Sequence, residues 1–234
     1  MNIEKINATG KTNTFKFFSL MSSIYVALIF LTMVIENHVV ILGSIKILSG
    51  TLVIPLSYAI SDVIAEIYGY YEMRRLIWVS IIVLYGSAFI IFVIMHLPVD
   101  VSNHSNDAYK IIFGPFLKDV VTYSIATFLG VFLNTYLISK WKILVKGRYF
   151  WLRSLGASMI GEAIFITTWG FLGFSDKFPL KTLLSLMLIS YLCKLIYNLC
   201  AIIPTSILVV ILRNAEGEEN CSRGIDFNPF AWQG

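Results

Sequence analysis

Two acidic residues interrupt an otherwise mostly apolar stretch of the chain. Asp62 and Glu66 are four residues apart, so on a helix their side chains lie on one face. Ionisable side chains are costly inside a membrane helix and by default mark a functional site. The pair therefore predicts a binding site near the end of a membrane-spanning helix. In the alternative interpretation the helix ends early and leaves both carboxylates hydrated beside Arg74 and Arg75.

Four further polar residues fall inside apolar stretches. They are Asn134, Glu162, Lys194 and Asn198, and the last two are again four residues apart. A charge that faces lipid costs about 2.5–3.5 kcal/mol, so we expect these side chains to point inward. Glu162 and Lys194 could also form a structural ion pair between two helices. Asn134 and Asn198 could equally hold helices together, at about 0.6 kcal/mol for such a contact.

Other chemistry has little support in the sequence. The histidines are scattered without metal-ligand spacing, and glycine motifs for nucleotide phosphates are absent. No activated nucleophile accompanies the carboxylates. We therefore expect neither an enzyme nor a bound metal or cofactor. Trp151 fits the aromatic belt of a membrane protein, whereas Trp78 and Trp169 fit either that belt or the site.

The composition identifies the elements that must position these residues. Of the 234 residues 57% are hydrophobic and 14% are charged, against about 25% charged residues in soluble domains. The sequence therefore predicts an all-α, polytopic integral membrane protein. Its domain is a bundle of six transmembrane helices over residues 17–212, between a cytoplasmic segment (1–16) and a cytoplasmic tail (213–234). Spans are expected at about 17–35, 45–66, 76–97, 118–139, 154–174 and 182–212.

The distribution of basic residues predicts that both chain ends are cytoplasmic. Twelve lysines and arginines fall on the side of the N-terminus, five on the other side, and Lys194 within the membrane. The twelve are Lys5, Lys11, Lys16, Arg74, Arg75, Lys140, Lys142, Lys146, Arg148, Arg153, Arg213 and Arg223, and the five are Lys46, Lys110, Lys118, Lys177 and Lys181. Orientation and contact with anionic lipid explain the net charge of +4 better than nucleic-acid binding does. The six spans are also compatible with two inverted halves of three helices.

Three motifs resemble the queuosine precursor transporter family, also called the putative vitamin uptake transporter family. The first is P-L-S-Y-x-x-S-D-x-x-x-E-x-Y-G, from Pro55 to Gly69, followed by Arg74, Arg75 and Trp78. The second is K-G-R-x-x-W-L-R-S, from Lys146 to Ser154, followed by Ser158, Gly161 and Glu162. The third is Lys194 with Tyr197, followed by Pro204 and Thr205. The motifs occur in the family's order, and the resemblance covers about Ser19 to Leu212.

The resemblance implies a multi-pass protein of the bacterial inner membrane that imports 7-deazaguanine bases, the cyano and aminomethyl precursors of queuosine. A guanine-like edge offers two adjacent N–H donors, which one carboxylate can accept. Asp62, Glu66 and Glu162 are candidate acceptors. Asn134, Asn198 or Lys194 could donate to the ring carbonyl, and Tyr58, Trp78 or Trp169 could stack on the ring.

The chain departs from the family at two positions and leaves alternatives open. Phe165 and Asn198 stand where the family often has acids, and both changes remove negative charge from the expected cavity. A substrate-binding subunit of an energy-coupled vitamin or nucleobase uptake complex is the alternative function. Membrane lipids are expected partners, nucleic acid is not, and a homo-oligomer is compatible with the sequence.

Overall fold

The computed structural model describes residues 4–6, 12–43, 45–98, 105–216 and 228. Long helices dominate it: α1 (Phe18–Ile35), α2 (Gly50–Ile67), α3 (Tyr70–Met95), α5 (Phe116–Leu144), α6 (Phe150–Phe174) and α7 (Leu180–Glu216). The shorter elements are helix α4 (Ser105–Phe113), just before α5, and two antiparallel hairpins, β1 (Glu4–Ile6) with β2 (Thr12–Thr14) and β3 (Val39–Leu42) with β4 (Ile45–Leu48).

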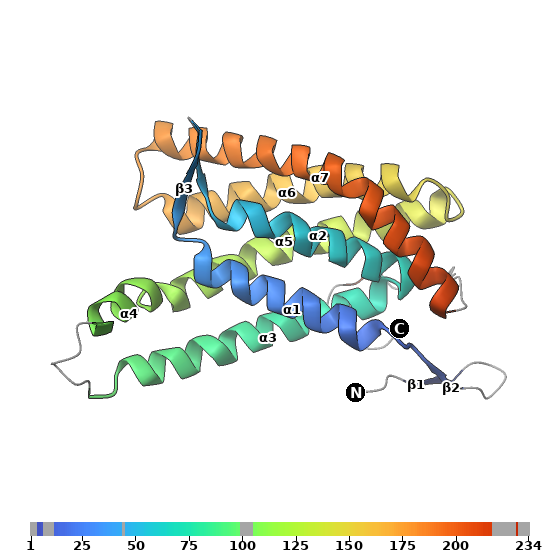
Figure 1. Cartoon of the computed structure of the whole chain (residues 1–234), viewed down its shortest axis with the longest axis horizontal. Helices are drawn as coiled ribbons and strands as arrows, with labels where there is room; N and C mark the ends of the chain where they lie inside the picture. Colours follow the sequence, from blue (N-terminus) through green and yellow to red (C-terminus); the bar gives the residue numbers. More distant parts are fainter. Residues whose placement is uncertain (1–3, 7–11, 44, 99–104, 217–227, 229–234) are drawn as a thin grey trace.

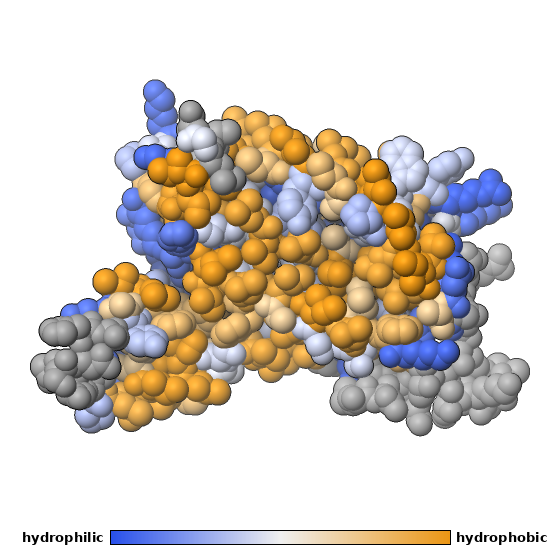
Figure 2. All heavy atoms as spheres, viewed as in Figure 1, coloured by the Kyte–Doolittle hydropathy of each residue, from blue (hydrophilic) through white to orange (hydrophobic). Residues whose placement is uncertain are grey.

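Six helical segments are long and apolar enough to cross a membrane, within the residues that the structure describes. This confirms the predicted six-helix polytopic membrane protein. Apolar side chains cover the middle of the surface seen in Figure 2, and hydrophilic residues gather toward the two ends. Large exposed hydrophobic residues lie along α3 and α7, among them Phe89, Ile203 and Ile207. In lipid this exterior carries no hydrophobic penalty, so the buried polar residues become the informative feature.

The predicted helix boundaries needed correction at several points. The second span was expected from residue 45, but β4 occupies residues 45–48 and α2 begins at Gly50. Apolar, β-branched residues flank Gly43, whose φ of +63° suits a tight hairpin turn. The run therefore forms two short strands instead of the first turns of a helix.

The third and fifth spans begin earlier than predicted, and the fourth ends later. Gly69, with a φ of +90°, separates α2 from α3 by a short break, so Arg74 and Arg75 lie in the first turns of α3. Helix α5 continues through Lys140 and Lys142 to Leu144, and α6 begins at Phe150. The connection of residues 140–153 that the predicted spans leave between them is thus reduced to a turn.

The bundle has two distinguishable ends. Both ends of the helical domain lie together, because the backbone N–H groups of Lys16 and Phe17 donate to the Glu216 carboxylate at 2.9 and 2.8 Å. We call this the terminal end, and the end that carries β3 and β4 the hairpin end (Figure 1). Helix α2 runs from the hairpin end to the terminal end through the middle of the bundle. Of its residues 72% are buried, against 22% in an apolar 18-residue stretch of α7.

Helices α5 and α6 cross at close range because both carry glycine at the contact. A Cβ on Gly161 would lie 2.8 Å from the Asn134 Cβ and 2.8 Å from the Gly130 carbonyl oxygen. A side chain at either glycine would push the helices apart. Small residues at such crossings are typical of membrane bundles, and this one places Asn134 of α5 against α6.

We expect Gly161→Ala to lower the free energy of unfolding by about 1–3 kcal/mol, the usual cost of overpacking. Gly86→Ala in α3 is the matched control, because a Cβ at Gly86 would meet nothing within 4 Å. Alanine also forms helices better than glycine does, so the control should keep or raise the thermal midpoint in detergent. Equal midpoints for the two variants would contradict the close crossing.

Candidate functional site

Buried polar side chains form a continuous series through the bundle, from the terminal end to the hairpin end. We call this series the polar column. It is built mainly from α2, α5, α6 and α7, and its four carboxylates, in order, are Glu66, Asp62, Glu162 and Glu36. Their exposed fractions are 2%, 1%, 0% and 3%. Glu66 and Gly50, which contacts Glu36, are sixteen positions apart on α2, or about 24 Å along the helix axis.

Glu66 lies in an ionic cluster at the terminal end of the column. The Arg153 guanidinium donates to both of its carboxylate oxygens, at 3.0 and 3.1 Å. Arg213 donates to Oε1 at 3.2 Å, and the Lys142 Nζ lies 3.8 Å from Oε1. One carboxylate thus joins cations from α5, α6 and α7. Glu66 is therefore saturated by protein donors and closes the terminal end of the column.

Asp62, one helical turn away, is held by neutral donors. The Asn134 Nδ2 donates to Oδ1 at 2.7 Å. The Ser158 hydroxyl donates to Oδ2 at 3.2 Å, and the Ser154 hydroxyl donates to the same oxygen. The structure therefore buries both Asp62 and Glu66, and the alternative of a hydrated interfacial pair is wrong. A cavity of about 10 Å³, roughly enough for one water molecule, adjoins Asp62, Ser158 and Asn198.

Glu162 lies near the middle of the column and has an unused acceptor. The Asn198 Nδ2 donates to its Oε1 at 3.1 Å, whereas its Oε2 has no hydrogen-bond partner among the described residues. The Tyr58 hydroxyl, also buried, has none within the same part of the chain. Lys194 interacts electrostatically with Glu162. Buried polar groups are rarely left unpaired, so these two atoms are candidates for contact with the polar groups of a ligand.

Aromatic rings surround this part of the column. Phe165 and Trp169, one turn apart on α6, stack with their ring centroids 6.4 Å apart. Tyr58 approaches Phe165 edge-on at 6.3 Å, and Tyr123 does so at 5.6 Å. The Lys194 Nζ lies 5.3 Å from the centroid of the Phe165 ring. The combination of flat apolar faces with few polar atoms is typical of a site for a planar ligand.

Glu36 completes the column at the hairpin end. It follows α1, and its Oε1 accepts a hydrogen bond from the Trp169 Nε1 at 3.1 Å. Burial raises the pKa of the Glu36 carboxyl to about 7, although Lys194 and the Trp169 hydrogen bond oppose the shift. A cavity of about 30 Å³ lies beside Glu36, Thr51, Ser190 and Lys194.

The structure brings together most of the side chains that sequence analysis selected. Asp62, Asn134, Glu162, Lys194, Asn198, Tyr58 and Trp169 all belong to the polar column. Trp78 does not: it packs against Phe128 and Phe132 at the contact of α3 with α5, with centroids 6.2 and 5.8 Å away. Glu66 joins the column but is occupied by Arg153 and Arg213.

Glu36 was missed by the sequence analysis. It lies at the polar end of the first predicted span, where a carboxylate is normally hydrated. Its only signal was position, because Glu36, Asn37 and His38 are a short polar break between the first span and the apolar residues that begin at Val39. Tyr123, which contacts Phe165 and Trp169, carried no signal beyond its place in a span.

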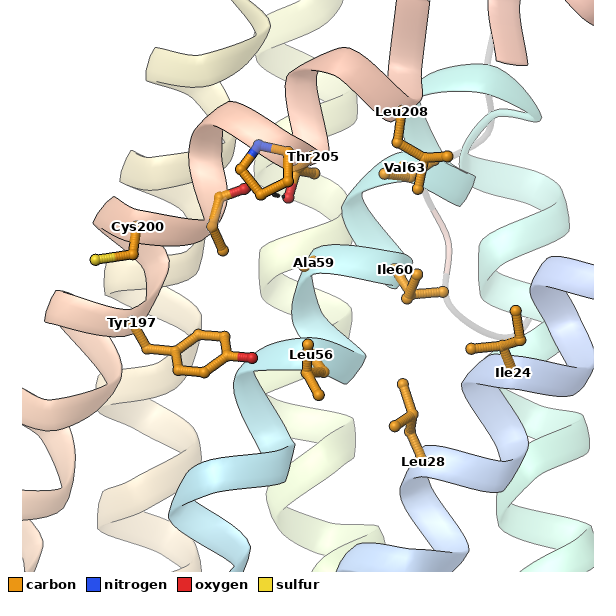
Figure 3. A pocket seen from close by; sticks show the side chains of 12 residues that line it. Ile24, Leu28, Leu56, Ala59, Ile60, Val63, Tyr197, Cys200, Thr205 and Leu208 are labelled. Carbon is orange, nitrogen blue, oxygen red and sulfur yellow. Dashed lines mark hydrogen bonds between the residues drawn. The ribbon is translucent and has the colours of Figure 1, made fainter. Parts of the chain in front are cut away.

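An apolar groove of about 540 Å³ lies between α1, α2 and α7 (Figure 3). Leu56 and Ile60 of α2 and Ile24 and Leu28 of α1 face it, and Tyr197 lies on the α7 side. Ala59, Ala201 and Thr205 line both this groove and the small cavity at Asp62. Small side chains therefore separate the polar column from the side of the bundle at this point.

A family model described as "Putative vitamin uptake transporter" matches residues 49–209, which include α2, α3, α5, α6 and most of α7. No curated protein and no solved structure matches the chain. The matched range includes most of the polar column, although Glu36 lies before it.

Proposed function

Since this chain belongs to the putative vitamin uptake transporter family, we propose that it imports queuosine precursors, the 7-deazaguanine bases in cyano and aminomethyl forms. The family description supports uptake of a small molecule by a multi-pass membrane protein. The choice of base comes from the motif resemblance and from the chemistry of the column. We place the protein in the bacterial inner membrane, with residues 1–16 and 213–234 in the cytoplasm and no enzymatic step.

One observation carries the choice of a nucleobase-like substrate: two buried polar atoms, which find no hydrogen-bond partner in the described part of the chain, lie among aromatic rings. Glu162 Oε2 is an acceptor, and the Tyr58 hydroxyl is both donor and acceptor. The adjacent N–H donors of a guanine-like edge suit the Glu162 carboxylate, with charge-assisted hydrogen bonds. Phe165 and Trp169 offer faces to the ring. Asp62 and Asn134 then form the floor of the site toward the terminal end.

The described state is closed around this site. The two cavities along the column, of about 30 and 10 Å³, are far smaller than the roughly 300–1,000 Å³ of ordinary ligand pockets. Binding of a base therefore requires helices to separate. Helix α7 is the candidate for this movement, because it packs mainly on α2, α6 and β4 and few residues of its apolar stretch are buried. Such a movement would fit the alternating access of secondary transporters.

The direct test is binding and uptake of defined bases. Purified protein in detergent should gain thermal stability with aminomethyl- or cyano-7-deazaguanine, because a ligand that binds only the folded state stabilises it. Guanine and common vitamins serve as competitors. Cells that lack other transporters for these bases should accumulate them when they express this chain alone.

The binding and uptake results distinguish a transporter that acts alone from a subunit of an energy-coupled complex. Uptake by the chain alone would reject the energy-coupled subunit, which needs partner ATPases. Binding without uptake would favour that subunit. Stabilisation by a vitamin, with none by either deazaguanine, would reject the proposed substrate but keep the transporter.

A further inference from the structure

Glu36 is a carboxylate that the proposed contacts to the base leave unused. Its Oε1 is held by the Trp169 indole N–H at 3.1 Å. Its Oε2 is buried and has no hydrogen-bond partner in the described part of the chain. A Cβ built on Gly50 would lie only 1.4 Å from this Oε2. The carboxylate therefore occupies a place that exists because residue 50 has no side chain.

The charged groups around Glu36 do not fully balance its negative charge. Lys194 of α7 and Lys177 after α6 attract its carboxylate, and Asp119 of α5 repels it. Lys194 also interacts with Glu162. Glu36 and Glu162, both buried, therefore share the buried Lys194 ammonium, and one of these two negative charges is uncompensated there when both are ionised. A further cation in this part of the column would balance the charge, and a buried charge of this kind is stable only when it is compensated.

We propose that Glu36 forms a subsite for a primary ammonium group on the transported base. An ammonium has three donors and no acceptor. Glu36 Oε2 can accept one of them, and the hydroxyl oxygens of Thr51 and Ser190, 3.2 Å apart beside the same cavity, can accept others. The inference rests on the proposed function. It adds that the aminomethyl base, which carries the ammonium, is favoured over the cyano base, whose nitrile group has no donor.

The test compares the two bases on Glu36→Gln, by calorimetric titration of full-length protein in nanodiscs. Glutamine keeps the shape of the side chain and can still accept from Trp169, but it removes the charge. We expect aminomethyl-7-deazaguanine to bind at least about tenfold more weakly than to the wild type, since a charge-assisted bond is lost. Cyano-7-deazaguanine should bind within about threefold of the wild type.

A second variant protects the test against a folding defect. Gly50→Ala keeps the charge but displaces the Glu36 carboxylate, so it should also weaken the aminomethyl base selectively. Asp176→Asn, which removes an exposed carboxylate at the hairpin end, is the matched control and should leave both affinities unchanged. Equal affinity changes for the two bases in Glu36→Gln would overturn the ammonium subsite but keep the proposed function. Failure of the wild type to bind either base would instead reject the proposed function, and the subsite with it.

Discussion

Replacing Glu66 with glutamine is expected to lower the free energy of unfolding by about 3–5 kcal/mol, the usual result of removing one partner from a buried ion pair. The Arg153 side chain that binds Glu66 is only 3% exposed, and Lys142 and Arg213 lie within salt-bridge distance of the same carboxylate. Without Glu66 these cations would repel one another with no anion between them. Helices α2, α5, α6 and α7 would lose their common contact.

The measurement is reversible unfolding in mixed micelles, with Asp176→Asn as the control. Asp176 accepts a hydrogen bond from Lys118 at 2.6 Å, closer than any contact of the Glu66 carboxylate, but the Lys118 and Asp176 side chains are 48% and 58% exposed. Exposed pairs contribute about 0–1 kcal/mol. The longer, buried contacts should therefore matter more than the shorter, exposed one. Similar losses of unfolding free energy for the two variants would show that Glu66 does not hold the helices together at the terminal end.

The bundle itself was predictable because lipid imposes a simple requirement. A span needs about 20 apolar residues in a helix, and the chain meets that requirement six times. The boundaries were less predictable, since they depend on single residues. Gly43 turns an apolar run into the β3–β4 hairpin, and Gly69 allows α3 to begin well before its first apolar stretch. Hydropathy counts apolar residues but does not detect backbone conformation.

The site was predictable in its residue types but not in its pairing. Asp62 and Glu66 share a face of α2, which the four-residue spacing predicted. That spacing did not predict that Asp62 would meet serines and an asparagine, whereas Glu66 would meet arginines. The partners come from α5, α6 and α7, and their register against α2 depends on packing such as the Gly130–Gly161 contact. Glu36 became part of the column only because the hairpin returns the chain to place Gly50 against it.

Replacing Glu162 with glutamine is expected to reduce uptake, measured as kcat/KM, by at least about 100-fold. The carboxylate Oε2 has no hydrogen-bond partner among the described residues, and a hydrogen bond to a charged group contributes about 1.5–3 kcal/mol. Loss of two such bonds to a guanine-like edge exceeds a factor of 100, at 1.4 kcal/mol per factor of ten. Glutamine would also direct an N–H group at the donors of the base in one of its two orientations. Initial uptake rates of labelled base, normalised to the amount of inserted protein, give the result.

Stability decides whether such a loss of uptake reflects binding or folding. If Glu162 were a structural residue, Glu162→Gln would lower the thermal midpoint together with uptake. A binding residue predicts the opposite, because its buried, half-satisfied carboxylate costs desolvation energy that the neutral amide reduces. Asn198 can still donate to the glutamine Oε1, and Lys194 keeps its interaction with Glu36. The midpoint should therefore stay the same or rise while uptake is lost, and a fall in both would assign Glu162 to the structure of the bundle.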